Sequence, residues 1–195
     1  MKTRVARFPI EPIILNRWSS RALSGESITE HEFMLLIEAA RWAQSSFNNQ
    51  PWRFLYALRD TPDWQMFFDL MIPFNQEWAQ RAAVLIVVVS HILFEYNGKP
   101  SRTHSFDTGA ATQTLTLQGY AQGLVAHAIE GFDYEKAHKV LQIPDDYTVE
   151  AMIVVGKPGK KDLLSPELQA REEFTDRKET ELILCRGCWS IDKKH

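Results

Sequence analysis

The sequence predicts a three-layer α+β domain, on three observations. Two short runs rich in β-branched residues, VLIVVVS (84–90) and TVEAMIVVGKP (148–158), have the composition of central strands covered on both faces. Helical patterns surround them without the regular spacing of a doubly wound parallel sheet. With 195 residues, 45% of them hydrophobic, the chain can bury one sizeable core, so we expect a single domain over residues 1–195.

Capping residues mark the helix starts in the first half of the chain. Thr29 and Glu32 fit a capping box, with Ile28 and Phe33 in the flanking apolar positions, so a helix is expected to begin there. A strand is expected to end near Leu58. Other helices are expected at residues 13–18, after the cap Thr61 with Pro62 in its first turn, and at 74–81 beyond Pro73.

A long helix is expected at residues 104–124, and it carries little charge on any side. A helix of this kind is buried in a core or between subunits. Gly119 and Gly123 would destabilise its interior by roughly 1 kcal/mol each relative to alanine, and close packing against another backbone would compensate. The sequence of this helix therefore gives a first indication of a dimer.

The last part of the chain changes in character. Asp133 can cap a helix that runs to Leu141, before Pro144. The segment from about residue 160 to 195 is charged and rich in turn residues, and only ELIL (181–184) returns to a strand-like pattern.

Composition excludes several classes of function. The net charge of −3 provides no basic excess for a nucleic acid backbone, so no nucleic acid partner is expected. The longest apolar run, 82–89, is far shorter than the ~20 residues of a membrane helix, and residues 1–12 lack the apolar core of a signal peptide. We therefore expect a cytoplasmic protein without a membrane partner.

The two cysteines, Cys185 and Cys188, form a single C-x-x-C motif. Structural zinc sites usually have four ligands, and a redox C-x-x-C would open a helix after a strand, so we interpret the motif as incidental. The histidines are scattered without metal spacing, and no metal site is expected.

Common nucleotide, hydrolase and metalloprotease motifs are absent, so an enzyme with this sequence would take its reactivity from a bound cofactor. Arg17, Ser19 and Arg21 in NRWSSRAL suit a phosphate monoester, or else form a solvated basic turn. The uncharged polar loop 45–50 offers many hydrogen-bonding atoms, or else is an Asn-rich turn after a helix. Gly131 after Glu130 permits close approach of a flat ligand, or else belongs to an ordinary turn.

Together, the three segments resemble the nitroreductase family of FMN-dependent oxidoreductases. NRWSSRAL is similar to the R-x-S-x-R segment of that family, QSSFNNQPWRF to its P-S-S-x-N-x-Q-P-W loop, and AIEGFD to its P-I-E-G-F. The resemblance extends from about Ile13 to Trp189. It implies a three-layer α/β/α domain with a mostly antiparallel central sheet, in an intertwined homodimer whose C-terminal extension (about 160–195) packs on the partner.

The resemblance also implies roles for individual residues. Arg17 and Ser19 would bind the FMN phosphate with the late basic pair Arg177 and Lys178, and Arg21 would reach the ribityl and pyrimidine side. Asn75 would bond the polar edge of the isoalloxazine, and the backbone N–H of Gly131 would lie near N5 with Glu130 beside it, so no catalytic side chain is expected. The complete expected cofactor site is Arg17, Trp18, Ser19, Arg21, Gln44, Ser45, Ser46, Asn48, Asn75, Glu130, Gly131, Arg177 and Lys178.

The implied activity is the ping-pong transfer of reducing equivalents from NADH or NADPH, through FMN, to an electron-poor acceptor such as a nitroaromatic or quinone. Trp78 departs from the lysine found in some members, and the segment 92–103 is shorter than the usual insertion. Two alternatives stay open: a flavoenzyme of the same fold with another reaction (dehalogenation, oxidation of a peptide-like substrate or flavin fragmentation), and an FMN-binding protein without turnover.

Overall fold

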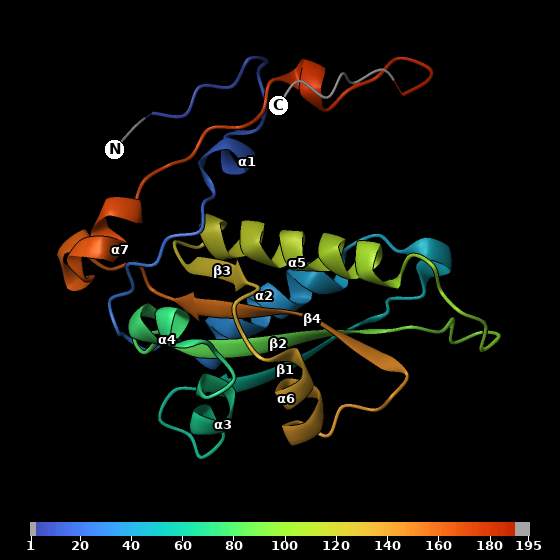
Figure 1. Ribbon diagram of the computed structural model, residues 1–195, viewed down its shortest axis with the longest axis horizontal. Helices are drawn as coiled ribbons and strands as arrows, with labels where there is room; N and C mark the ends of the chain where they lie inside the picture. The colour runs from blue at the N-terminus through green and yellow to red at the C-terminus, as the bar shows by residue number, and fades with distance from the viewer. Residues whose placement is uncertain (1–2, 190–195) are drawn as a thin grey trace.

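The computed structural model describes residues 3–189 (Figure 1). The helices are α1 (Pro12–Asn16), α2 (Glu30–Arg41), α3 (Trp64–Phe68), α4 (Pro73–Ala79), α5 (His104–Ala121), α6 (Tyr134–Val140) and α7 (Pro166–Arg171). The strands are β1 (Trp52–Leu58), β2 (Val84–His91), β3 (Val125–Ile129) and β4 (Tyr147–Gly156). Short 3-10 turns lie at Ser46–Asn48, Lys161–Leu163 and Thr180–Leu182.

The strands form one sheet in the order β1-β2-β4-β3, and every neighbouring pair is antiparallel. The register places Trp52 opposite Ser90 and Val84 opposite Val155. Strand β3 lies at one edge of the sheet, and the residues after it turn back toward α4. This edge adjoins the segment that carries Arg17 and Arg21.

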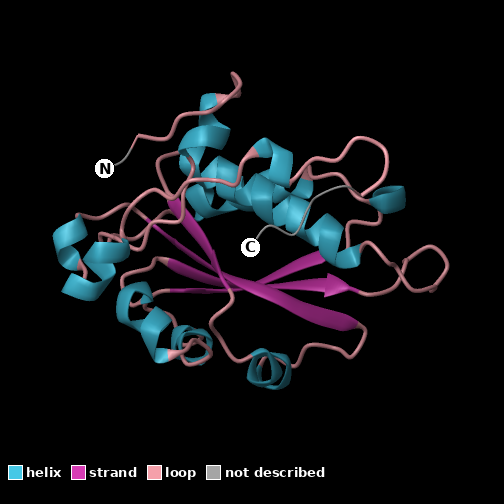
Figure 2. Cartoon of the chain, turned by 45° about the horizontal axis from the view of Figure 1, so that its top comes forward, coloured by secondary structure: helices cyan, strands magenta, loops and turns pink. Residues whose placement is uncertain are grey.

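Helices cover both faces of the sheet, as Figure 2 shows. Leu85, Val87 and Val89 of β2 belong to a core cluster that includes residues of α3, α4 and α6. Val84, Ile86 and Val88 belong to a second cluster with residues of α2 and α5. This strict alternation follows from the two-residue period of a strand. The predicted α+β class with three layers and an antiparallel sheet is confirmed.

Several local predictions are also confirmed. The capping box at Thr29 is present, with Thr29 Oγ1 accepting from the Glu32 backbone and the Glu32 carboxylate accepting from the Thr29 backbone. Ile28 packs against the cluster of α2 and α5. The Asp133 side chain accepts a hydrogen bond from Lys136 N at 2.8 Å and caps α6.

Three local predictions are wrong: the start of one helix, the end of another and the strand at ELIL. Thr61 does not cap a helix: its hydroxyl bonds the Leu58 carbonyl, and α3 begins only at Trp64. Helix α1 ends at Asn16 because Arg17 is extended, with ψ of 129°. The strand-like ELIL segment forms a 3-10 turn instead, because it has no neighbouring strand to pair with among the described residues.

The glycines of α5 have explanations within the chain. Helix α5 ends at Ala121, and Gly123 has a φ of 76°, so it ends the helix instead of weakening its interior. A Cβ on Gly119 would lie 3.2 Å from the Cβ of Ala126 in β3. The close approach at Gly119 is therefore to the chain's own sheet, and Gly119 gives no indication of a dimer. No helix in the described part of the chain is long and apolar enough to cross a bilayer.

Candidate functional site

The segment after α1 lines an arginine-rich cavity of about 550 Å³. Trp18, Ser19 and Arg21 line it together with Arg17 from the end of α1. The N-terminal arm adds Arg4, and the segment after α7 adds Phe174, which contacts both the Trp18 ring (centroids 4.9 Å apart) and the Arg4 guanidinium. Arg177 also lines this cavity, whereas Lys178 is exposed and does not.

Four arginines of this cavity form no ion pair in the described part of the chain. Within residues 3–189, no carboxylate forms an ion pair with Arg4, Arg17, Arg21 or Arg177. Burial and then the neighbouring Arg4 and Arg177 charges lower the pKa of Arg17. The Nε of Arg4 is enclosed and has no hydrogen-bond partner. A group of guanidiniums held together against their mutual repulsion is suited to a multiply charged anion such as a phosphate.

Glu172 fixes the backbone of this segment, and sequence reasoning missed it. Its side chain is buried, with 1% of the residue exposed. The carboxylate accepts hydrogen bonds from the Ser20 hydroxyl, from Arg21 N (3.1 Å) and from Ala22 N (3.2 Å). These bonds fix the backbone of residues 20–22, next to the side chains of Arg17, Ser19 and Arg21 that line the cavity.

A second cavity of about 330 Å³ shares Arg17 and Ser19 with the first. Its remaining walls are mostly small side chains of β3, β4 and α5: Ala126, Ala128, Ala151, Gly109, Thr108, Thr112 and Thr116. Glu150 lies at the bulge of β4, between the pairs Val88–Ala151 and Val89–Val149, and it accepts a hydrogen bond from the Ser105 hydroxyl at 2.7 Å. Bulges often re-aim side chains next to active sites. Two cavities that share a wall, one cationic and one lined mostly by small residues, suit a phosphate linked to a flat ring.

Asn75 lies beneath the turn that follows β3. Its Nδ2 donates to the Gly131 carbonyl at 2.9 Å, and its Oδ1 accepts from Trp78 Nε1 at 3.3 Å. Asn75 and Trp78 are both buried. The amide of Asn75 is thus occupied within the chain, and it positions the Gly131 turn in this structure.

Gly131 is required by close packing within the chain. A Cβ there would lie 2.6 Å from Asn75 Nδ2 and 2.8 Å from Ile72 Cδ1. Its carbonyl also accepts from Ile72 N, whereas its own N–H makes no hydrogen bond in the described part of the chain. Glu130 beside it is exposed. The turn therefore presents one unbonded N–H beside an exposed carboxylate.

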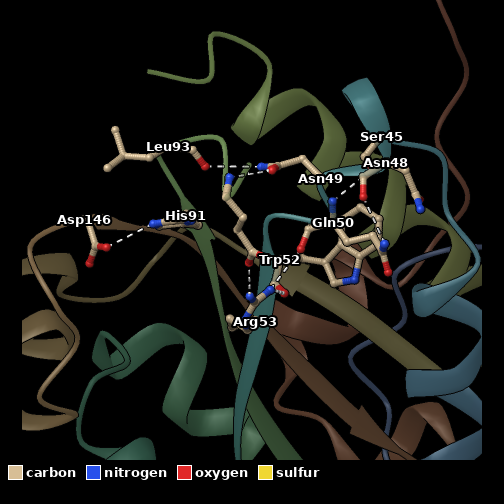
Figure 3. A network of polar contacts seen from close by, with 10 residues as sticks. Ser45, Asn48, Asn49, Gln50, Trp52, Arg53, His91, Leu93 and Asp146 are labelled. Carbon is tan, nitrogen blue, oxygen red and sulfur yellow. Dashed lines mark hydrogen bonds and ion pairs between the residues drawn. The ribbon is translucent and has the colours of Figure 1, made fainter. Parts of the chain in front are cut away.

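The polar loop lies at the other end of α5. Ser46 N donates to the Asp107 carboxylate at 3.0 Å, and Gln50 N donates to Ser45 Oγ at 3.0 Å. Asn49 holds the neighbouring segment, since its Nδ2 donates to the Leu93 carbonyl and its Oδ1 accepts from Glu95 N (Figure 3). Much of the polarity of the loop thus serves to fix the loop itself.

The same loop carries backbone strain. Phe47, Asn48 and Gln50 have φ values of 53°, 53° and 48°, in the left-handed region that non-glycine residues rarely adopt. Phe47 is 77% exposed, and Gln44 and Asn48 are also exposed. Strained residues that a network of bonds holds in place are frequent at ligand sites. Within one chain, however, this loop lines neither cavity that contains Arg17.

The cysteines lie in the tail, away from both cavities. Cys188 is exposed and Cys185 is partly buried. No group of three or more His, Cys, Asp or Glu residues that could hold a metal occurs within residues 3–189.

Comparison with known proteins identifies the family. A sequence model described as the Nitroreductase family matches residues 14–63 and 61–157. The chain belongs to the nitroreductase family. One relative of this chain, Protein DrgA of Synechocystis sp., is 30% identical over 173 residues, which cover 71% of this chain and 81% of that protein.

A second relative, from Archaeoglobus fulgidus, carries the name of a candidate NADH dehydrogenase/NAD(P)H nitroreductase, and it is 25% identical over 75% of this chain and 83% of its own. A crystal structure of an oxidoreductase containing FMN superposes on this nitroreductase-family chain with a TM-score of 0.93 and 36% identity over 97% of both chains. These similarities confirm the resemblance and the fold.

Sequence reasoning missed three residues of the site. Arg4 lies in an arm without a motif, and Glu172 lies in a charged segment where one carboxylate resembles the next. His127 interrupts the apolar strand β3, and that interruption was an available signal.

Proposed function

We propose that this protein is an FMN-dependent oxidoreductase that passes reducing equivalents from NADH or NADPH to an electron-poor acceptor, such as a nitroaromatic or a quinone, by a ping-pong mechanism. The observation that carries the proposal is the cavity with four arginines outside any described ion pair, beside a second cavity lined mostly by small residues. The 36% identity to an oxidoreductase containing FMN supports the same cofactor here. The relative named for NAD(P)H supports a nicotinamide donor.

The residues present fit FMN. Arg17, Ser19 and Arg177 would hold the phosphate, with Arg4 as a further cation and Arg21 toward the ribityl chain. The unbonded N–H of Gly131 would offer a hydrogen-bond donor to N5, with Glu130 beside it and Asn75 holding the turn. Trp18 lines the cavity through its contact with Phe174. Lys178, which is exposed and follows Arg177, would add a further cation at the rim of the cavity.

FMN, when bound, supplies reversible hydride exchange at its N5 atom, so no protein nucleophile is required. The chain positions the ligands and shapes the local field. Guanidiniums of Arg17 and Arg21 stabilise negative charge on a bound ligand, and donors fixed before the reaction contribute most to such stabilisation. Because Glu172 already fixes the backbone that carries these arginines, little reorganisation is needed when the anion enters.

A homodimer would complete the site. Residues 3–11 and residues 176–189 extend beyond the body of the domain (Figure 1), and the exposed ion pair Arg7–Glu181 joins the two segments. Exposed apolar residues lie on both segments: Val5 is 87% exposed and Leu184 is 69% exposed. Such surfaces mark protein interfaces. We expect these segments to pack on the partner subunit. We also expect the 45–50 loop of the partner to reach the FMN with Ser45, Ser46 and Asn48, together with Gln44 just before the loop.

A spectroscopic experiment tests this proposal. The protein is purified, its bound flavin is identified by mass, and NADH or NADPH is added without oxygen. We expect FMN, bleaching of its absorbance, and recovery of the colour when a quinone or nitroarene is added. A yellow protein that neither nucleotide bleaches would favour the non-catalytic FMN-binding protein or another flavin reaction, and FAD or no flavin would refute the assignment. We expect this reaction in the cytoplasm.

A further inference from the structure

His127 is the one histidine of the described chain that lines the arginine cavity. It lies on the edge strand β3 and is 8% exposed. Its ring stacks on the indole of Trp78, with centroids 4.8 Å apart and an interplanar angle of 24°. Trp78 is in turn held by Asn75, so the plane of the imidazole is fixed.

The hydrogen bonds of His127 define its tautomer. Nδ1 lies 3.0 Å from the carbonyl oxygen of Ser20. A carbonyl oxygen only accepts, so Nδ1 carries the proton and donates. Nε2 has no hydrogen bond to any described residue, and it is not among the fully enclosed atoms that lack a partner. It therefore opens toward the cavity with a free lone pair.

Burial and the neighbouring arginines keep the His127 ring neutral. Burial is the largest effect and lowers the pKa of His127 to about 4; Arg21 and Arg17 lower it as well, while the Ser20 hydrogen bond and Glu172 oppose the shift. The other charged groups lining this cavity are Arg4, Arg171, Arg177 and Glu173. At neutral pH the ring is an uncharged acceptor in a cavity where guanidiniums can only donate.

A ligand that satisfies this cavity must carry both hydrogen-bond acceptors and a hydrogen-bond donor. The guanidiniums need acceptor oxygens, which a phosphate supplies, and His127 Nε2 needs a donor, which a fully ionised phosphate lacks. We propose that His127 Nε2 accepts a hydrogen bond from a hydroxyl of a polyol phosphate, so the cavity recognises the ribityl hydroxyls of FMN as well as its phosphate. The inference rests on the proposed FMN function. It assigns to His127 a positioning role that selects a polyol chain.

Matched ligands and variants test this inference. In His127→Asn, the Asn amide replaces the Nδ1 donor to Ser20 but places nothing at Nε2. The dissociation constants of FMN, riboflavin and methyl phosphate are measured for both proteins by fluorescence quenching and calorimetry at about pH 8, where methyl phosphate is a dianion without an O–H donor. We expect His127→Asn to bind FMN and riboflavin about tenfold more weakly, the scale of one hydrogen bond, and methyl phosphate unchanged. An equal loss for methyl phosphate, or no loss for FMN, would overturn the inference.

Nitrogen NMR of the wild-type ring keeps the inference falsifiable if His127→Asn does not fold. We expect the His127 Nε2 resonance to shift upfield when FMN is added, with the ring unprotonated at neutral pH. An unchanged Nε2 resonance in protein saturated with FMN, or a protonated ring, would refute the role of His127 while leaving FMN binding intact. A wild-type protein that binds no FMN would overturn both this inference and the proposed function.

Discussion

Glu172→Ala should destabilise the fold and weaken cofactor binding together. The change leaves the buried Ser20 hydroxyl and the partly buried Arg21 N without their acceptor, whereas Ala22 N keeps its bond to Ser20 Oγ at 3.2 Å. One enclosed unpaired donor costs about 1–3 kcal/mol. Part of this is offset because the variant no longer buries a carboxylate. We expect the free energy of unfolding to fall by about 2 kcal/mol.

The same change releases the backbone that aligns Arg17, Ser19 and Arg21. We expect the dissociation constant of FMN to rise about tenfold, equivalent to about 1.4 kcal/mol. Glu172→Gln keeps one acceptor oxygen and should lose less than about 1 kcal/mol of stability. Urea unfolding followed by circular dichroism, with FMN titration of the folded protein, measures both quantities.

Glu167→Gln is the matched control. Its carboxylate is exposed and pairs with Arg171 on the surface of α7, so its loss should change stability by less than about 0.5 kcal/mol. If Glu172→Ala were as stable as this control, the buried carboxylate would not hold residues 20–22, and the explanation for the shape of the arginine cavity would be wrong.

Four further predictions concern the site, the tail, the dimer and pH. Arg17→Ala should weaken FMN binding by about 1.5–3 kcal/mol, and an unchanged dissociation constant would remove Arg17 from the site. Cys185→Ser with Cys188→Ser should leave flavin content and NAD(P)H oxidation within about twofold, whereas one zinc per chain by elemental analysis would contradict the incidental reading. Refolding Arg17→Ala/Arg21→Ala together with Ser46→Trp/Asn48→Ala should restore up to about a quarter of wild-type activity, because one site of each mixed dimer is intact; confirmed mixed dimers without recovery would place the loop and the arginines on one chain. The pKa of His127 is 6.5 in the unfolded chain and about 4 in the folded protein, so the unfolded state binds more protons between these two pH values. The free energy of unfolding should therefore fall by up to about 3 kcal/mol as the pH drops from 6.5 to 4. Urea titrations at several pH values measure this slope, and His127→Asn should flatten it.

Local sequence patterns determined the elements whose causes lie within a few residues. The β-branched run of β2 is buried along Val84–Ser90, as its composition predicts. The capping box at Thr29 and the cap at Asp133 depend on partners three residues away, and both are present. The chemistry of the R-x-S-x-R segment suited a phosphate but also a solvated basic turn, and the resemblance of three segments to one family decided between the two interpretations.

Other features depended on partners distant in the sequence. ELIL has strand-like residues, but a strand needs a neighbour for its backbone bonds, and none of the described strands lies beside it. Gly119 and Gly123 both read as helix-weakening residues, yet one contacts β3 and the other ends α5. Thr61 has the composition of a cap and instead bonds the carbonyl of Leu58.

The cationic cavity shows what sequence and tertiary structure each determined. The sequence alone supplied Arg17, Ser19, Arg21 and Arg177, together with the family that relates them. Only the fold placed the Glu172 carboxylate against Arg21 N and Ala22 N, about 150 residues away in the chain, and the His127 imidazole against the Ser20 carbonyl. Glu and His have no periodicity that distinguishes a buried contact from a solvated one. Their roles follow from desolvation and from the donors that surround them, and the packing of distant segments creates both.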